Sequence, residues 1–326
     1  MTLKPKSSIP SLFFLLFLFV SLSGQAYGFP VNVTESSTAA KATKKIRLFL
    51  IGNSFSVNAS KYLPQLVKER GHELIIGRAE LGGCSLQRHW EIAEAYEANP
   101  EDPKGRQYQG KSLKMLLSEG NWDIVTIQQN SMNSTDPATY RPYARNLYNY
   151  IKAIVPQAEV VMHQTWAYRT DAKTFGQIGP NQHAQSAEEM YEKSRAAYQS
   201  VAAELGVRLL PVGDAFWKIN SHPKWAYQKD KSFSQENAVS PALPAQKNSL
   251  HVGYYWNQEN KLALDANHAN AAGEYVGSLV WYACLFPESP TKLKFVPEGI
   301  SPDFAHALKK AAKKAVKNQK EEKIKT

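Results

Sequence analysis

Residues 46–56 read Ile-Arg-Leu-Phe-Leu-Ile-Gly-Asn-Ser-Phe-Ser. The apolar run Leu48–Ile51 is typical of a strand buried on both faces of a parallel sheet, and Gly52 ends it. Ligands of open α/β sheets bind beyond the carboxyl ends of the strands, so the Ser54 hydroxyl is expected at a position suited to chemistry. The alternative is that Asn53 and Ser54 only cap the helix that follows, as these residue types often do.

The rest of the chain repeats this pattern of strand followed by helix. Further strands are predicted at 73–81, 122–127, 159–163 and 207–211, and helices at 61–70, 86–98, 113–118, 140–155, 186–205 and 270–286. Alternation of this kind implies right-handed crossovers and helices on both sides of a parallel sheet. The sequence therefore predicts an α/β fold with a central parallel sheet of about five strands.

The start of the chain is expected to lie outside the main domain, which is assigned to residues 46–290. Residues 1–28 combine two lysines, an apolar run and a small-residue site, which together indicate a cleaved signal peptide. Residues 29–45 are predicted to be a flexible lead-in. The apolar run is too short to span a bilayer comfortably. We therefore expect an exported protein, periplasmic or extracellular, with no stable membrane span after cleavage.

The net charge of +10 comes mainly from the two ends of the chain. Residues 291–326 form a basic tail, of which 301–326 hold eight Lys and three acidic residues, and the signal adds +2. The remaining charge of about +3 on the body does not favour nucleic-acid binding. The tail is interpreted as a frayed, solvated basic helix, with a partner site as the alternative. A monomer is expected.

Cysteine, histidine and glycine patterns argue against metals and cofactors. The two cysteines, Cys84 and Cys284, lie in different settings and are predicted to be free thiols. The eight His form no His-Glu-x-x-His motif and there is no Cys-x-x-Cys, so no transition-metal site is expected. No Gly-x-Gly-x-x-Gly motif or P-loop follows the first strand, which argues against a nucleotide cofactor.

Residues 220–262 interrupt the alternation with a long, polar, aromatic-rich segment. A segment of this length is uncommon in a compact domain unless it has a function or is disordered. Its aromatic residues, among them Trp225 and Tyr254–Trp256, suit stacking against sugar rings. The alternative, given equal weight, is a loop packed on the body of the protein.

Polar turns follow the first three strands and are expected to meet at one edge of the sheet. A further motif, Asp265-x-x-His268, is placed at the start of the last helix. An Asp at this spacing can hold the imidazole by Nδ1 and leave Nε2 to take a proton from a serine. Ser54, His268 and Asp265 therefore form a candidate nucleophile, base and orienting acid.

The same turns contain candidate donors for an oxyanion hole. These are the backbone N–H groups of Ser54 and Gly83 and the side-chain amide of Asn130. A glycine at position 83 is interpreted as leaving room for the reacting oxygen. Cys84 is a rival nucleophile, but Ser54 already has an Asp–His pair and needs fewer assumptions.

Residues that follow the second and fourth strands are candidates for contact with the substrate. Arg88 and His89 follow the turn after the second strand, and Trp166 and Tyr168 follow the fourth. Trp256 of the aromatic segment is the remaining candidate. His163, at the end of a strand, is interpreted as packed or hydrogen-bonded rather than catalytic.

The motifs Ile-Gly-Asn-Ser-Phe-Ser, Gly-Gly-Cys-Ser-Leu-Gln-Arg-His-Trp, Gln-Gln-Asn-Ser and Asp-x-x-His occur in the order found in the SGNH (GDSL-like) hydrolases. Residues 46–286 resemble an exported bacterial branch of that superfamily. The resemblance implies a flavodoxin-like three-layer sandwich and hydrolysis of esters, often of acyl groups on carbohydrates. It gives Ser54, Gly83, Asn130, Asp265 and His268 the roles described above. Asn53 replaces the Asp of the usual Gly-Asp-Ser, and that Asp is not a member of the family's triad, so the change removes no catalytic group.

The sequence therefore predicts an exported serine esterase without cofactors, acting on a small-molecule or polysaccharide ester and most readily on acetylated carbohydrates. Hydrolysis of lipids or thioesters, or acyl transfer to a sugar, is the alternative within enzymes. A non-catalytic glycan-binding protein on the same fold is the alternative outside them.

Overall fold

The computed structural model describes residues 43–286 and 288–325. The predicted signal peptide and almost all of the predicted lead-in therefore lie outside the described residues. Within the described ranges, no helix is both long enough and apolar enough to cross a membrane.

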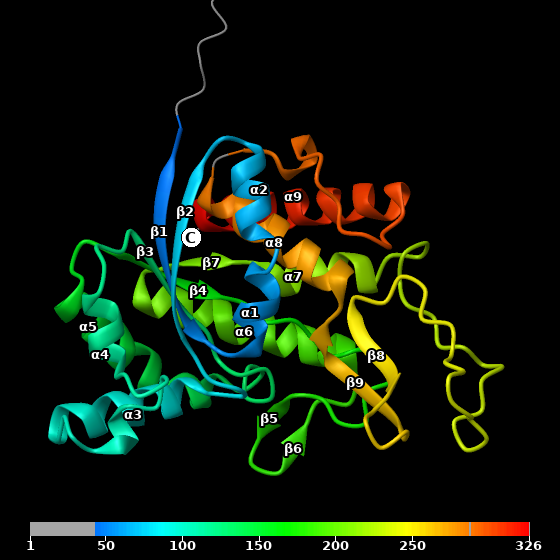
Figure 1. Ribbon diagram of the computed structural model, residues 1–326, viewed down its shortest axis with the longest axis horizontal. Helices are drawn as coiled ribbons and strands as arrows, with labels where there is room; N and C mark the ends of the chain where they lie inside the picture. The colour runs from blue at the N-terminus through cyan, green and yellow to red at the C-terminus, as the bar shows by residue number, and fades with distance from the viewer. Residues whose placement is uncertain (1–42, 287, 326) are drawn as a thin grey trace, which may run out of the picture. The chain divides into compact units, whose positions relative to one another are not determined.

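A five-stranded sheet forms the centre of the fold, and all of its strand pairs are parallel. Its strand order is β2-β1-β3-β4-β7 (Figure 1). The strands are β1 (Lys45–Gly52), β2 (Glu73–Glu80), β3 (Ile124–Ile127), β4 (Glu159–His163) and β7 (Arg208–Leu210). The predicted α/β fold is thus confirmed. Because the chain winds outward in opposite directions from β1 and β3, their carboxyl ends border the crevice in which such sheets bind ligands.

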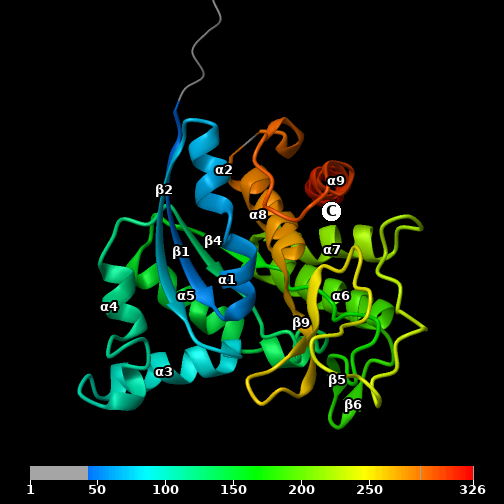
Figure 2. The same ribbon diagram turned by 45° about the vertical axis from the view of Figure 1, so that its right-hand side comes forward.

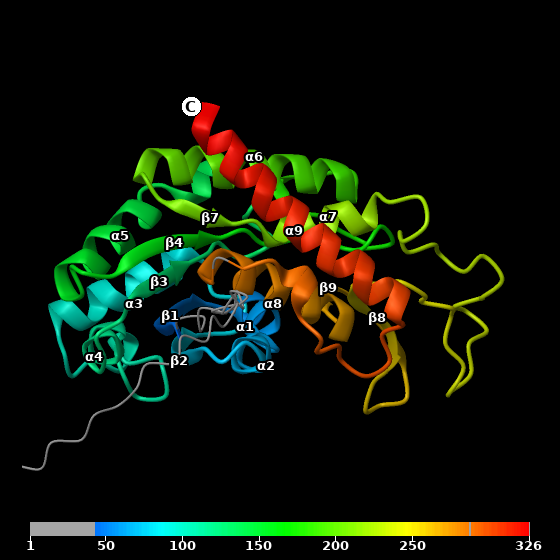
Figure 3. The same cartoon turned by 90° about the horizontal axis from the view of Figure 1, so that it is seen from above.

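Helices cover both faces of the sheet, as Figure 3 shows. Along β1, Leu48 and Leu50 pack into the core that contains α1, α2 and α8, whereas Phe49 and Ile51 pack into the core beneath α3, α4 and α5. This alternation explains the unbroken apolar run in the sequence. The bounds of the helices are α1 Ser54–Ser60, α2 Leu63–Glu69, α3 Leu86–Ala98, α4 Leu113–Ser118, α5 Tyr143–Ile154, α6 Ala187–Leu205, α7 Val212–Asn220, α8 Ala271–Leu285 and α9 Pro302–Lys325, with short 3-10 turns at Pro103–Gly105, Pro137–Tyr140 and Pro290–Lys292.

Two small antiparallel ribbons accompany the sheet. One pairs β5 (Gln177–Gly179) with β6 (Gln182–His183), and the other pairs β8 (His251–Trp256) with β9 (Leu262–Ala269). The second ribbon corrects the prediction for the Asp-x-x-His motif. That motif lies on β9 and not at the start of a helix, and α8 begins only after its Asn270 cap.

The basic tail also differs from its prediction, because α9 packs against α7 and α8 instead of standing in solvent (Figure 2). One face of α9 is buried, and it consists of Phe304, Ala305, Leu308, Ala311, Ala312, Ala315 and Val316. The lysines occupy the other positions. The prediction of a solvated helix was wrong because it judged the segment by its charge, while alanines at helical spacing supply an apolar face.

Candidate active site

Ser54 is the first residue of α1 and follows directly on the end of β1. Asn53 caps this helix, and its Oδ1 accepts the N–H of Phe55 at 3.0 Å. A Cβ on Gly52 would lie 2.1 Å from the Ser56 hydroxyl, so the tight turn requires glycine. Asn53 therefore caps the helix as the simpler interpretation proposed, and the hydroxyl of Ser54 remains available for another partner.

That partner is His268 on β9. Ser54 Oγ lies 2.9 Å from His268 Nε2. On the other side of the ring, His268 Nδ1 lies 2.9 Å from Asp265 Oδ2. Asp265 Oδ1 also accepts the backbone N–H groups of Asn267 and His268, which fixes the carboxylate against the strand. Three residues predicted from two separate motifs thus form one continuous hydrogen-bonded series.

The ionised form of Asp265 and the protonated form of His268 stabilise each other. Burial acts to raise the pKa of Asp265, but hydrogen bonds from the side chain and backbone of His268 outweigh it and lower the pKa to about 2. The hydrogen bond to Asp265 raises the pKa of His268 against the opposing effect of burial. Asp265 is consequently ionised at neutral pH and able to stabilise an imidazolium.

Backbone contacts from three other parts of the chain hold β9 in place. Asn58, one turn after Ser54 on α1, accepts the N–H of Ala269 through Oδ1 at 3.3 Å. Trp166 Nε1 donates to the carbonyl of Asn267 at 2.9 Å. The N–H of Arg169 donates to the Ala266 carbonyl at 2.8 Å. The strand that carries Asp265 and His268 is therefore fixed on both sides of the imidazole.

Trp166 does not face the solvent, contrary to the prediction that it contacts the substrate. Only 1% of it is exposed. Its ring stacks on Phe55 with centroids 4.2 Å apart and on Phe216 with centroids 4.4 Å apart. The tryptophan is a buried support beneath β9. Its place in the turn after a buried strand was visible in the sequence, but the direction of its ring was not.

Hydrogen bonds also join the turns that follow β1, β2 and β3. Asn53 Nδ2 donates to the Cys84 carbonyl at 3.0 Å, and Asn130 Nδ2 donates to the Gly83 carbonyl at 3.2 Å. Within the described residues, the N–H groups of Ser54 and Gly83 donate no hydrogen bond. Gly83 has φ +62°, and a Cβ there would meet nothing within 4 Å. The positive φ of Gly83 favours glycine at this position, and the room it leaves for a reacting oxygen stays a prediction.

A buried network that sequence reasoning missed connects the ends of β1, β3 and β4. Gln128 Nε2 donates to Asn53 Oδ1 at 2.7 Å, and Gln128 Oε1 accepts from His163 Nδ1 at 2.8 Å and from the Ser56 hydroxyl. Burial lowers the pKa of His163 to about 3, so the ring is neutral. His163 is packed and hydrogen-bonded, as predicted. The only signal for Gln128 was a polar residue directly after a buried strand.

The other predicted substrate contacts differ in exposure. His89 is fully buried, donates from Nε2 to the Gly52 carbonyl at 3.1 Å and lies 2.7 Å from the Tyr108 hydroxyl. Burial lowers its pKa to about 4, so it acts as a neutral support for the turn. Tyr168 is also buried, with its hydroxyl 2.8 Å from Ser131 Oγ. Arg88 is exposed on the first turn of α3. The half-buried Trp256, on β8, donates from its indole to the carbonyl of Ala242.

Both cysteines are free thiols, as predicted. Cys84 is buried, and burial raises its pKa to about 12. Because the thiolate is the reactive form, this environment disfavours Cys84 as a nucleophile.

A second cluster that the sequence did not reveal anchors the aromatic segment. The guanidinium of Arg169 is buried, pairs with Asp171 at 2.7 Å and donates to Gln246 Oε1 at 2.6 Å. The same guanidinium lies over the ring of Tyr227, 4.2 Å from its centroid, and over that of Tyr254, 5.3 Å from its centroid. The aromatic residues of this cluster are thus packed on the body, which was the alternative left open for residues 220–262.

The described residues contain no group of three or more His, Cys, Asp or Glu that could hold a metal ion.

Comparison with known proteins gives solved structures of similar fold. A DUF4886 family protein from Bacteroides uniformis ATCC 8492 is 24% identical, with a TM-score of 0.62, covering 83% of this chain and 95% of that one. A proposed GDSL-like lipase from Parabacteroides merdae ATCC 43184 is 12% identical, with a TM-score of 0.41 and coverages of 74% and 95%. The periplasmic domain of a lipopolysaccharide acetyltransferase from Salmonella Paratyphi A is 10% identical, with a TM-score of 0.42 and coverages of 75% and 84%.

A GDSL-like lipase and an acetyltransferase are thus among the solved structures similar to this chain. No sequence among curated proteins matches it. A family profile described as a domain of unknown function, DUF4886, matches residues 47–219, which is more than half of the chain. The chain therefore belongs to the DUF4886 family.

Proposed function

We propose that this protein is an SGNH-type serine hydrolase that cleaves carboxylic esters. The observation that carries the proposal is the pair of 2.9 Å contacts that link Ser54 Oγ to His268 Nε2 and His268 Nδ1 to Asp265 Oδ2. This is the geometry in which an imidazole takes the serine proton while a carboxylate holds its tautomer.

The reaction begins when Ser54 Oγ attacks the ester carbonyl carbon and its proton passes to His268 Nε2. The C=O π electrons move to the oxygen, which becomes an oxyanion. Collapse of this tetrahedral intermediate expels the alcohol, which leaves with the proton from His268, and the acyl group stays on Ser54. Water then attacks the acyl-enzyme with His268 again as base, releasing the acid and restoring Ser54.

Three donors are proposed to stabilise the oxyanion. The free N–H groups of Ser54 and Gly83 belong to turns that hydrogen bonds tie together, and Asn130 Nδ2 already contacts the Gly83 carbonyl. An amide nitrogen has two hydrogens, so Asn130 retains one for the substrate. Donors fixed before the reaction stabilise the developing charge without reorganising.

Acyl groups on carbohydrates, acetyl above all, are the proposed substrates, on the strength of the resemblance to the SGNH hydrolases. We propose hydrolysis as the reaction; 38% of the His268 side chain is exposed, so water can reach the base. We further propose that the protein acts after export.

The test compares kcat/KM for p-nitrophenyl acetate and for acetylated xylan among the wild type, Ser54→Ala and Ser118→Ala. Ser118 is an exposed serine at the end of α4 and serves as the matched control. We expect Ser54→Ala to lose about 10⁴-fold or more while Ser118→Ala is unchanged. Full activity of a folded Ser54→Ala variant would refute the proposal, and acetate release without an added acceptor separates hydrolysis from transfer.

A further inference from the structure

Two hydrogen bonds join α1, which carries the proposed nucleophile, to β9, which carries the proposed base. The first is the reactive pair itself, Ser54 Oγ with His268 Nε2 at 2.9 Å. The second lies one turn further along α1 and one residue further along β9, where the N–H of Ala269 donates to Asn58 Oδ1 at 3.3 Å. Among the residues that the structure describes, no other hydrogen bond links α1 directly to β9. The ring of Phe55 lies 6.0 Å from that of His268 and adds packing without a directional bond.

The other contacts of β9 lead to different parts of the fold. The indole of Trp166 and the N–H of Arg169 both hold this strand, but they come from the segment that follows β4. Asp265 belongs to β9 itself and therefore moves together with the imidazole. When the reactive pair is broken, the hydrogen bond of Asn58 is consequently the one that still joins the strand of the base to the helix of the nucleophile.

A buried carboxylate on α8 fixes the orientation of the Asn58 amide. Asn58 Nδ2 donates to Glu274 Oε1 at 3.2 Å, so Oδ1 faces the N–H of Ala269. Glu274 is 6% exposed, lies in the first turn of α8, and pairs through Oε2 with Lys61 Nζ at 2.7 Å. Because the carboxylate only accepts and the backbone N–H only donates, the two neighbours allow one orientation of the amide between them.

We propose that Asn58 is a positioning residue that keeps His268 in place during the second half of the reaction, while Ser54 is acylated. This inference rests on the proposed hydrolase function. In the free enzyme, the Ser54 hydroxyl donates toward His268 Nε2 and holds the ring itself. In the acyl-enzyme, Oγ is bonded to the acyl carbon and has no hydrogen to donate, so this contact is lost.

Deacylation needs the imidazole at the same position. Water attacks the acyl carbon and gives its proton to His268 Nε2, while the C=O π electrons move to the carbonyl oxygen. The C=O bond then re-forms, the bond from the acyl carbon to Ser54 Oγ breaks, and Oγ takes the proton from Nε2 as the acid leaves. A misplacement of about 1 Å lowers the rate of such a step about 10²-fold. The hydrogen bond from Ala269 to Asn58 involves none of the reacting atoms, so it persists through acylation and restrains the base.

Pre-steady-state hydrolysis of p-nitrophenyl acetate tests the proposal, because it separates acylation from deacylation. Asn58→Leu removes both hydrogen bonds of the amide at similar side-chain volume. We expect its deacylation rate constant to fall about 10- to 100-fold, while kcat/KM, which reports acylation, stays within about threefold of the wild type. KM should therefore fall together with kcat, and the acetyl-enzyme should accumulate, which mass spectrometry of the intact protein detects.

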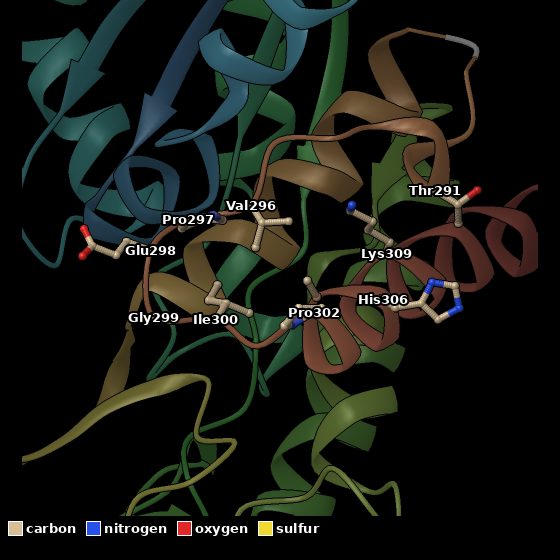
Figure 4. A pocket seen from close by; sticks show the side chains of 10 residues that line it. Thr291, Val296, Pro297, Glu298, Gly299, Ile300, Pro302, His306 and Lys309 are labelled. Atoms are coloured by element: carbon tan, nitrogen blue, oxygen red, sulfur yellow. The ribbon is translucent and has the colours of Figure 1, made fainter.

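Two further variants separate positioning from a general loss of structure. Asn58→Asp places a second carboxylate against Glu274 and should slow deacylation. Asn58→Asp/Glu274→Gln exchanges the acceptor and the donor at unchanged net charge and should restore deacylation to within about threefold of the wild type. The control Lys309→Met removes a 2.7 Å hydrogen bond to the carbonyl of Leu293 and should change neither rate constant. Lys309 lines a cavity of about 400 Å³, shown in Figure 4, whose lining includes no residue of the proposed active site.

Three outcomes would overturn the inference alone. Equal falls of kcat and kcat/KM in Asn58→Leu, without accumulation of the acetyl-enzyme, would do so, because a merely structural role slows both steps alike. Wild-type deacylation in Asn58→Leu would do so as well, and so would failure of the double variant to recover. A folded wild type that neither hydrolyses the ester nor reacts with a fluorophosphonate would instead refute the proposed function, and this inference with it.

Discussion

Trp166 offers a sharp test of how the fold positions the proposed base. The variant Trp166→Phe keeps an aromatic ring between Phe55 and Phe216 but removes the indole N–H that donates to the Asn267 carbonyl at 2.9 Å. Asn267 lies directly before His268. The change therefore leaves the stack largely filled and frees the segment of β9 that carries the imidazole.

The expected loss of stability combines two contributions. An unsatisfied, partly buried carbonyl costs about 1–3 kcal/mol, and the space left by the smaller ring adds about 1 kcal/mol. We expect the free energy of unfolding to fall by about 2–4 kcal/mol, which lowers Tm by about 5–10 °C for a unit of this size. Misplacement of His268 by a fraction of an ångström should lower kcat by about 10- to 100-fold.

Calorimetry and steady-state kinetics with p-nitrophenyl acetate measure the two effects separately. KM should change by no more than about twofold, because the ring does not reach the substrate. Phe216→Leu is the matched control, since it disturbs the same stack but keeps the hydrogen bond to Asn267; it should lower Tm and spare kcat. A raised KM with unchanged kcat in Trp166→Phe would show that Trp166 contacts substrate and would refute this reasoning.

Three further predictions concern the proposed active site and the C-terminal helix. Asp265 raises the pKa of His268, and only the neutral imidazole accepts a proton, so kcat/KM should fall as the pH drops through that raised pKa. In a pH-rate profile, Asp265→Asn should move the midpoint of this fall to lower pH and should lower kcat by about 10⁴-fold. Leu308→Ala should lower the free energy of unfolding, measured by urea denaturation, by about 2–5 kcal/mol, because Leu308 is buried. The control Lys313→Ala, at an exposed position of the same helix, should change it by less than about 0.5 kcal/mol. Equal effects of the two variants would mean that α9 is not docked. Asn130→Ala should lower kcat by about 10²–10³-fold with little change in KM, because the proposed donor acts on charge that appears only in the transition state. Asn130→Asp should be at least as harmful. Wild-type kcat in a folded Asn130→Ala variant would show that Asn130 only closes its loop.

Most of the parallel sheet and its helices could be predicted from the sequence because their signals are local. The helix at Leu86–Ala98 has the bounds that were predicted for it. The strand at Glu159–His163 likewise matches its prediction. Each of these elements buries an apolar pattern that is complete within its own residues, so no distant partner is needed to recognise it.

The errors arose where the outcome depends on distant partners. His89 and Trp166 looked available for a substrate, yet both are buried by contacts with residues remote in the chain. The Asp-x-x-His motif gave the correct pairing of Asp265 with His268 but the wrong element, because β9 pairs with the neighbouring strand β8, which the sequence analysis left within the long polar segment. The many lysines of α9 led to the prediction of a solvated helix. Its apolar face is buried because it packs against α7 and α8.

Covalent labelling of the intact protein by a fluorophosphonate, followed by mass spectrometry, tests the central claim most directly. An activated serine attacks the phosphorus and expels fluoride, so the account predicts one adduct, on the peptide that contains Ser54. Labelling should be lost in a folded His268→Ala variant, which retains the hydroxyl but not the base. An adduct on Cys84, or no adduct on the folded wild type, would contradict the assignment of Ser54, His268 and Asp265.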